Sequence, residues 1–308
     1  MVSRLSALLI SLLIGTAAVA SEPEKLGALD DYADLLHPAG EHVEGLIRRG
    51  RVARSGDWRA WYSGDTARYA HGVLGDEWEA ETLVVERAGE RFQFTLGPDS
   101  VFEDLEPRIA DLNNDGVPEF IAIKSYLNAG AAVALFGFRD GVFAPLAESE
   151  PIGSANRWLN PAGVADYDGD GATEIAVVRT PHIGGIIQHF GWDGGPVLRL
   201  ERSVRGYSTH RIGSTLLALS ITLDWNGDGI PDLMLPRQDH RTLTVVTWTG
   251  EEFVELAAFT NEARIATRFA RIRPPQGQQS GSAGEYVIYG LEDGTVRAIK
   301  IPVPPGPQ

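Results

Sequence analysis

The most informative segment of this sequence is Asp166-Tyr-Asp168-Gly-Asp170-Gly171-Ala-Thr-Glu174, which is followed by the apolar run 175–178. Two more segments share its pattern, D-x-[DN]-x-D-G-x-x-[DE]: residues 111–119 precede it and residues 224–232 follow it. The first two segments begin 55 residues apart and the second and third begin 58 apart. Recurrence at a nearly constant interval predicts an array of similar supersecondary units.

The residues between these acidic loops also follow a common order. Each loop is followed by an apolar run, a polar or glycine-rich break, a second apolar run, a tight turn such as Asp140-Gly141, and a further apolar run. Short runs rich in Val, Ile, Phe and Trp between turn residues indicate β-strands. Four strands per unit is the content of one propeller blade, so the sequence predicts an all-β propeller with repeats at about residues 107–160, 161–218 and 219–264.

The flanking segments fit the same template less closely. Residues 58–98 offer strands at 61–62, 68–74, 83–85 and 92–96 without an acidic loop, and residues 267–301 are one strand short. A strand from the other terminus would complete that last blade and cover its open edge. We therefore predict five four-stranded blades within residues 57–303, after an N-terminal extension at 21–56. The alternative is a six-bladed ring to which residues 30–56 contribute.

The two ends of the chain have compositions of their own. Residues 1–20 combine a basic start, an apolar run and the small-residue ending Ala18-Val-Ala20, which is the pattern of a cleaved signal peptide. A short membrane anchor is the alternative interpretation. We predict export to the periplasm or the exterior, with no membrane insertion after cleavage. The loop at residues 274–284 should be exposed, and the tail at 304–308 should be disordered.

The acidic loops have the donor set of a calcium site. Side chains at positions 1, 3, 5 and 9 and the backbone carbonyl at position 7 supply oxygen ligands, and the glycine at position 6 permits the sharp turn. The expected ligands are Asp111, Asn113, Asp115, Val117 and Glu119; Asp166, Asp168, Asp170, Ala172 and Glu174; and Asp224, Asn226, Asp228, Ile230 and Asp232. We predict about three structural Ca²⁺ ions. The second loop has the most carboxylates and should bind most tightly.

Two alternatives compete with this interpretation of the loops. An EF-hand requires a Glu at position 12, but Ala122, Val177 and Leu235 stand there, and β-type runs follow in place of helices. The other alternative is a metal-free turn, because Asp, Asn and Gly are common in turns.

The overall composition excludes several classes of protein. With 42 acidic and 27 basic residues the net charge is −15, which argues against non-specific binding of nucleic acid. The chain contains no Cys, so thiolate metal sites, disulfides and cysteine nucleophiles are excluded.

The three loops and the strands after them resemble the FG-GAP/VCBS repeats of integrin α-subunit propellers and of many secreted bacterial proteins. The resemblance covers residues 107–260. It implies that each calcium loop joins the first two strands of a blade on the lower face and that ligands bind to the upper face. It implies no particular activity, since function depends on the site and not on the fold.

A binding or scaffold role on the upper face is therefore the leading hypothesis for function. Its partner would be a protein or an anionic or polysaccharide ligand. The candidate ligand-binding residues are Arg157, Trp158, His182, His210, Arg211, His240 and Arg241. The alternative for these side chains is packing between blades and pairing with carboxylates.

Two further functions stay open from the sequence. No catalytic motif is present, so we assign no catalytic residues; a propeller enzyme that cleaves a glycan or a polar small molecule would have to use upper-face carboxylates, for which the candidates are Asp76, Glu77, Glu79 and Asp239. A purely structural domain of an envelope assembly is the third possibility.

Overall fold

The computed structural model describes residues 22–273 and 284–303. The signal peptide predicted at residues 1–20, most of the loop predicted at 274–284 and the tail at 304–308 lie outside the described residues. The described part is all-β and is built of antiparallel sheets, as predicted, with one short 3₁₀ helix and one helical turn near the N-terminus.

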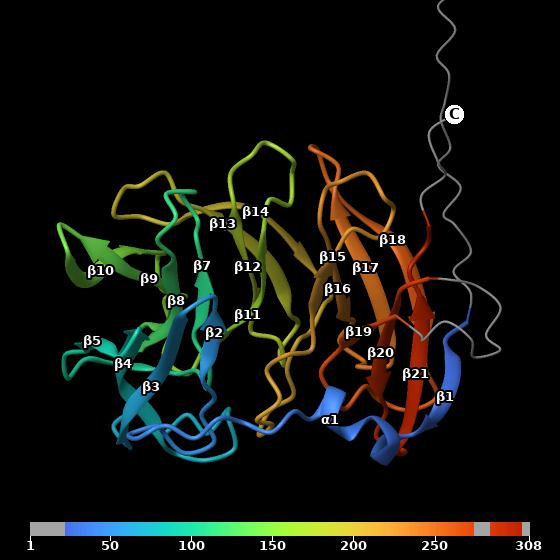
Figure 1. The fold of residues 1–308 in the computed structure, drawn as a ribbon, viewed down its shortest axis with the longest axis horizontal. Helices are drawn as coiled ribbons and strands as arrows, with labels where there is room; N and C mark the ends of the chain where they lie inside the picture. Colours follow the sequence, from blue (N-terminus) through green and yellow to red (C-terminus); the bar gives the residue numbers. More distant parts are fainter. Residues whose placement is uncertain (1–21, 274–283, 304–308) are drawn as a thin grey trace, which may run out of the picture.

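Each of the three predicted repeats forms four strands that pair in sequence order (Figure 1). They are β7 (Arg108–Ala110), β8 (Glu119–Tyr126), β9 (Gly130–Arg139) and β10 (Val142–Glu148); β11 (Leu159–Ala165), β12 (Glu174–Arg179), β13 (Ile186–Gly191) and β14 (Arg199–Arg205); and β15 (Ile221–Leu223), β16 (Asp232–Pro236), β17 (Thr242–Trp248) and β18 (Phe253–Thr260). The predicted turn at Asp140-Gly141 joins β9 to β10, and both residues have positive φ, as a tight hairpin requires.

A fourth group precedes these repeats. It consists of β2 (Ala53–Ser55), β3 (Trp58–Thr66), β4 (Glu79–Arg87) and β5 (Glu90–Thr95), and β6 (Ser100–Phe102) links β4 to β8. The strand predicted at residues 68–74 is wrong, because β3 already occupies the place beside β4 and residues 67–78 form a loop. Tyr69, Val73 and Leu74 are buried in that loop, so their apolar character reflects burial without strand conformation.

The last group contains β19 (Ala270–Ile272), β20 (Tyr286–Gly290) and β21 (Thr295–Lys300). Its fourth strand is β1 (Glu24–Ala28), which pairs antiparallel with β21. The prediction that the other terminus completes this unit is confirmed. After β1, residues 29–52 contain η1 (Leu29–Tyr32), α1 (Ala33–Leu36) and an isolated bridge from Leu46 to Ser63, with no sheet of their own.

Apolar side chains join most neighbouring groups. One cluster extends from the β2–β5 group through β11–β14, and others join β11–β14 to β15–β18 and β15–β18 to the last group. Among the described residues, no apolar cluster contains side chains of both the β2–β5 group and the last group. Instead, the segment after β1 packs against each of these two groups. Throughout residues 22–273 and 284–303, no helix has the length and apolar character that crossing a membrane requires.

The first prediction concerns Leu36, which attaches this N-terminal segment to the last group. Its side chain is 1% exposed and packs with Tyr286, Ile288 and Val296. Leu36→Ala should lower the free energy of unfolding by about 2–5 kcal/mol, because it leaves a cavity in the core. Urea denaturation measures the loss. Leu35→Ala is the matched control, since Leu35 is 48% exposed and its truncation should cost less than about 0.5 kcal/mol. Equal losses in the two variants would show that α1 is not anchored in this way.

Candidate functional site

The three acidic loops each connect the first and second strands of a group, and they share one backbone geometry. The Asp at position 1 accepts a hydrogen bond from the glycine N–H five residues later, at 2.8, 2.9 and 3.0 Å in the three loops. Those glycines, Gly116, Gly171 and Gly229, have φ near +90°, a conformation that other residues rarely adopt. The loops therefore fold alike because the same side-chain acceptor and the same glycine recur.

The carboxylate that closes each loop forms the second shared contact. Glu119, Glu174 and Asp232 begin the second strand of their groups and are buried. Each accepts a hydrogen bond from the backbone N–H seven residues earlier, at 2.7–2.8 Å. This contact holds the start of the second strand against the end of the first.

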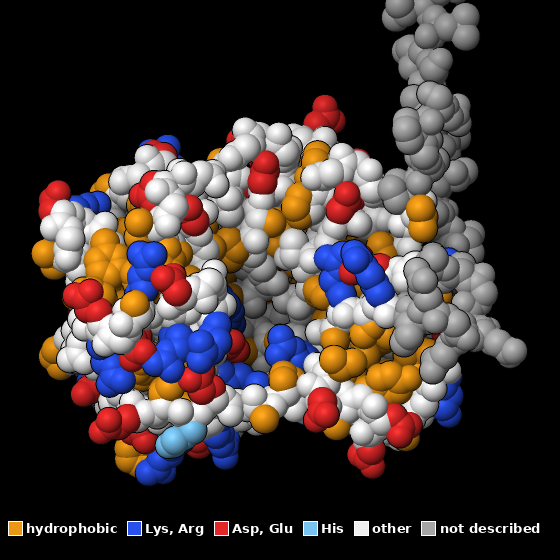
Figure 2. Space-filling view, in the orientation of Figure 1, with side chains coloured by type: hydrophobic (Ala, Val, Ile, Leu, Met, Phe, Trp, Pro, Cys, Tyr) orange, Lys and Arg blue, Asp and Glu red, His pale blue; other side chains and the backbone are white. Residues whose placement is uncertain are grey.

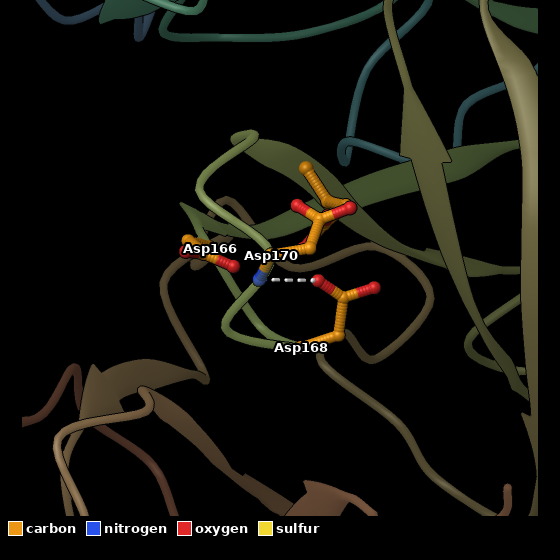
Figure 3. A group of neighbouring side chains, drawn as sticks. Asp166, Asp168 and Asp170 are labelled. Atoms are coloured by element: carbon orange, nitrogen blue, oxygen red, sulfur yellow. Dashed lines mark hydrogen bonds between the residues drawn. The ribbon is translucent and has the colours of Figure 1, made fainter. Parts of the chain in front are cut away.

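The second loop brings its four carboxylates together. Ligand oxygens of Asp166, Asp168, Asp170 and Glu174 all lie within 4.8 Å of one another. Figure 3 shows that the Asp side chains extend from one turn, in which the Asp170 N–H donates to the Asp168 carboxylate at 3.2 Å. Oxygen donors at this spacing suit a hard divalent cation such as Ca²⁺, and this donor set contains no nitrogen or sulfur ligand for zinc.

The first and third loops have an amide at position 3. Asn113 Nδ2 donates to Asp115 Oδ2 at 3.1 Å, and Asn226 Nδ2 donates to Asp228 Oδ2 at 2.7 Å. Each loop thus has one carboxylate fewer than the second loop. Calcium binding stays a prediction for all three loops, and the first and third share the backbone geometry of the second.

The closing carboxylates have raised pKa values. Burial, reinforced by repulsion from the neighbouring Asp residues, raises the pKa of Glu119 and of Glu174 to about 7 and that of Asp232 to about 6. Burial is the larger cause in all three. A bound cation would favour the ionised form of each of these groups.

Arg202 contacts the second loop, although no sequence pattern indicated this contact. Arg202, from β14, is 6% exposed at its side chain, and its Nη1 lies 2.6 Å from Asp168 Oδ2 while its Nη2 lies 3.3 Å from Glu174 Oε1. Burial opposes ionisation of Asp168, but Arg202 outweighs it and lowers the pKa of that carboxyl. This cation within the ligand set offsets the extra carboxylate, so charge count alone does not make the second loop the tightest site.

Three of the candidate upper-face residues are buried. Trp158 Nε1 donates to the Glu103 carbonyl at 2.7 Å, and its ring lies 4.7 Å from that of His210. His210 Nε2 lies 2.8 Å from the Ser214 carbonyl, and His240 Nε2 lies 3.0 Å from the Ser208 hydroxyl. These side chains pack and form hydrogen bonds within the protein.

The other four candidates are more accessible. His182 is half-buried, with its ring 6.2 Å from that of His210, so the structure brings Trp158, His182 and His210 together. Arg211 forms an ion pair with Glu292. Arg157 and Arg241 are exposed, and within the described residues their guanidinium groups donate to the backbone carbonyls of Asn156 and Glu262.

The candidate upper-face carboxylates are held differently from one another. Glu79 is buried, and Glu77 is exposed. Asp76 lies 3.5 Å from Arg49, and Asp239 accepts hydrogen bonds from Thr242. Asp239 precedes β17, so it belongs to a different strand group from the other three.

A buried carboxylate cluster was also missed, apart from its member Glu79. Glu79, Glu103 and Asp104 are all 1% exposed or less. His71 Nδ1 lies 2.5 Å from Glu103 Oε1, and the Ser125 hydroxyl donates to the other oxygen of Glu103. The available signal was the pair Glu103-Asp104 within an otherwise apolar run, 101–105.

Comparison with known proteins supports the interpretation of the repeats. Residues 104–177 match the family model of an FG-GAP-like repeat. This range contains the first two acidic loops, and it confirms the resemblance to FG-GAP/VCBS repeat proteins there. No curated protein matches the chain.

The second prediction concerns the pH dependence of stability. Burial, followed by repulsion from Glu103, raises the pKa of Glu79 to about 10, well above its ordinary value of 4.5. The folded protein therefore favours the protonated form. The stability that this form contributes is complete below the unfolded pKa and is lost progressively as pH rises toward the folded pKa.

Glu79→Gln should remove the loss of stability that ionisation of Glu79 causes as pH rises, because glutamine cannot ionise. Thermal unfolding between about pH 5 and 9 should show the variant gaining stability over the unmodified protein as pH rises. Glu77→Gln is the control, because Glu77 is an exposed neighbour. Parallel pH profiles for Glu79→Gln and the unmodified protein would contradict the raised pKa.

Proposed function

We propose that this protein is an exported five-bladed β-propeller that binds structural calcium and acts as a binding or scaffold module. The observation that carries this proposal is the cluster of four carboxylates in the second loop. One oxygen from each of them lies within 4.8 Å of the others, at the junction of two strands. The same backbone hydrogen bonds in the other two loops extend it to about three ions.

Support for five blades comes from the order of the strands. Four-stranded groups follow one another along the chain, and β1 completes the last of them. The β6 strand joins the first two groups into one nine-stranded sheet, which we interpret as two blades with a linking strand.

Calcium would link the first and second strands of each repeat through the carboxylates between them. Several carboxylates crowded at one strand junction repel one another, and a bound cation converts that repulsion into attraction. Because the unfolded chain lacks the site, binding to the native state adds stability. We assign the ions a structural role, since the proposed ligand residues lie at the junction between the first two strands of each group.

The ligand-binding face would be the one opposite the calcium loops. The exposed side chains of Arg157 and Arg241 are the best candidates there, because their guanidinium groups retain donors for a protein, an anion or a polysaccharide. The signal peptide predicts a periplasmic or secreted location.

An enzyme remains the alternative function. The observation that favours it is the neighbouring pair Glu79 and Glu103: burial raises the pKa of both carboxyl groups, and Glu103 also contacts His71 and Ser125. Against it, both carboxylates are buried, and a substrate would need a path to them.

The third prediction tests the calcium sites. Calcium should raise the melting temperature of the protein, because a site contributes about 2.7 kcal/mol when calcium exceeds its Kd 100-fold. Asp170→Ala should remove the stabilisation that one bound ion contributes, so the rise in melting temperature on adding calcium should be several degrees smaller. Asp193→Ala is the control, since Asp193 is an exposed carboxylate outside the loops that pairs with Arg199. An equal calcium response in Asp170→Ala and the unmodified protein would count against the second loop.

Arg202→Met should have the opposite effect in the same experiment. Without calcium it should destabilise the protein, because Asp168 and Glu174 lose their cationic partner. With calcium the melting temperature should rise by more than in the unmodified protein. A smaller rise would show that Arg202 does not compete with the ion.

The fourth prediction tests the binding face. The double variant Arg157→Ala/Arg241→Ala should capture less of its partner from a cell-envelope extract in calcium, while its melting temperature stays unchanged. Arg199→Ala serves as control, because Arg199 is also exposed but lies outside this face, after the turn between β13 and β14. Undiminished capture by the double variant would refute this placement of the ligand.

A further inference from the structure

A cavity of about 300 Å³ lies where the first strands of the groups converge. Its walls come from residues at or before β2, β7, β11, β15 and β19, together with the end of α1. Figure 2 shows this face of the molecule hollowed in the middle, with Lys and Arg side chains around the hollow. We call this the central cavity.

The charge of the central cavity is opposite to that of the chain. Arg51, Arg108 and Arg268 line it, and Glu106 is the one carboxylate among the described lining residues. The chain as a whole has 42 acidic and 27 basic residues. Each arginine stands at or just before the first strand of a different group, so the three guanidinium groups approach from different sides.

These arginines have few partners in the protein. In the described part of the chain, the Arg268 side chain makes no hydrogen bond or ion pair. The Arg51 guanidinium has, within the same described residues, a single 3.5 Å contact, from Nη1 to the Pro38 carbonyl. Arg108 Nη1 lies 3.3 Å from Asp104 Oδ2. Asp104 therefore offsets part of the charge of Arg108, whereas the half-buried Arg51 and Arg268 keep positive charge available for a ligand.

The remaining walls are largely apolar. They include Leu36, Leu105, Val164, Leu216 and Leu217. Inorganic phosphate would satisfy the arginines but leave these walls without contacts. An organic anion with an apolar body fits both parts of the lining.

We propose that the central cavity binds a small organic carboxylate, with its charged group paired to the arginines and its apolar body against the leucine walls. The cavity contains none of the predicted calcium ligands and none of the candidate upper-face residues. It is therefore a separate site, beyond the function proposed above.

Hexanoate is a suitable probe, titrated calorimetrically into the calcium-loaded full chain. We expect saturable binding at one site. Arg268→Ala should weaken it about tenfold, as expected for a lost charge-assisted hydrogen bond, and Arg268→Lys should restore part of the affinity. Arg199→Ala should leave the affinity unchanged, because this exposed arginine lies outside the cavity. Melting temperatures show whether each variant is folded.

A second variant tests the apolar part of the site. Ala218→Trp places bulk in the lining while keeping the arginines, and it should abolish hexanoate binding. Hexanol and inorganic phosphate should both bind more weakly than hexanoate. Absence of saturable hexanoate binding, equal affinity in Arg268→Ala, or tighter binding of phosphate would each overturn the proposal. Asp170→Ala should still bind hexanoate, so a failure of the calcium sites is distinguishable from a failure of this one.

Discussion

The rest of the structure depends on the hydrogen bond between a buried carboxylate at the start of each second strand and the backbone N–H seven residues before it. The residue that provides this N–H is Leu112, Tyr167 or Trp225, and its own side chain is buried. One residue thus anchors the loop to the core through its side chain and to the next strand through its backbone. The polar side chains at positions 1, 3 and 5 lie in the turn outside that anchor, so in the second loop the carboxylate cluster is a consequence of how the strands are held.

Features that depend on local sequence could be predicted. The acidic loops, the hairpin at Asp140-Gly141 and the missing strand of the last group all follow from short patterns and from the order of strands. Residues 68–74 misled this approach, because burial of Tyr69, Val73 and Leu74 produces the same apolar pattern as a strand. Arg202 was missed for another reason: it meets Asp168 from a strand 34 residues later, and nothing near either residue signals that contact. The central cavity combines segments from the whole chain and has no local pattern at all.

The candidate upper-face residues show why loop composition alone locates a ligand poorly. Histidine and tryptophan in connecting loops can either face solvent or fill the space between sheets, and Trp158, His210 and His240 do the latter. Burial lowers the pKa of His210 and His240 to about 4, so both rings are neutral near pH 7. Neutral, hydrogen-bonded rings contribute to packing. The positive charge that remains accessible comes from arginines, whose guanidinium groups stay ionised at any physiological pH.

The distribution of charge connects the acidic loops to the central cavity. Four carboxylates cluster at the junction between β11 and β12, and three arginines line the cavity where the first strands of the groups approach one another. Each of these two groups places charges of the same sign in partly buried surroundings, which lowers the free energy of unfolding of the ligand-free protein. A ligand of opposite charge that binds only the folded chain offsets this cost by mass action. Calcium at the acidic loops and an organic carboxylate in the central cavity would therefore stabilise the fold in the same way, the first by neutralising negative charge and the second by neutralising positive charge. Both would make the stability of this fold depend on the solutes around it.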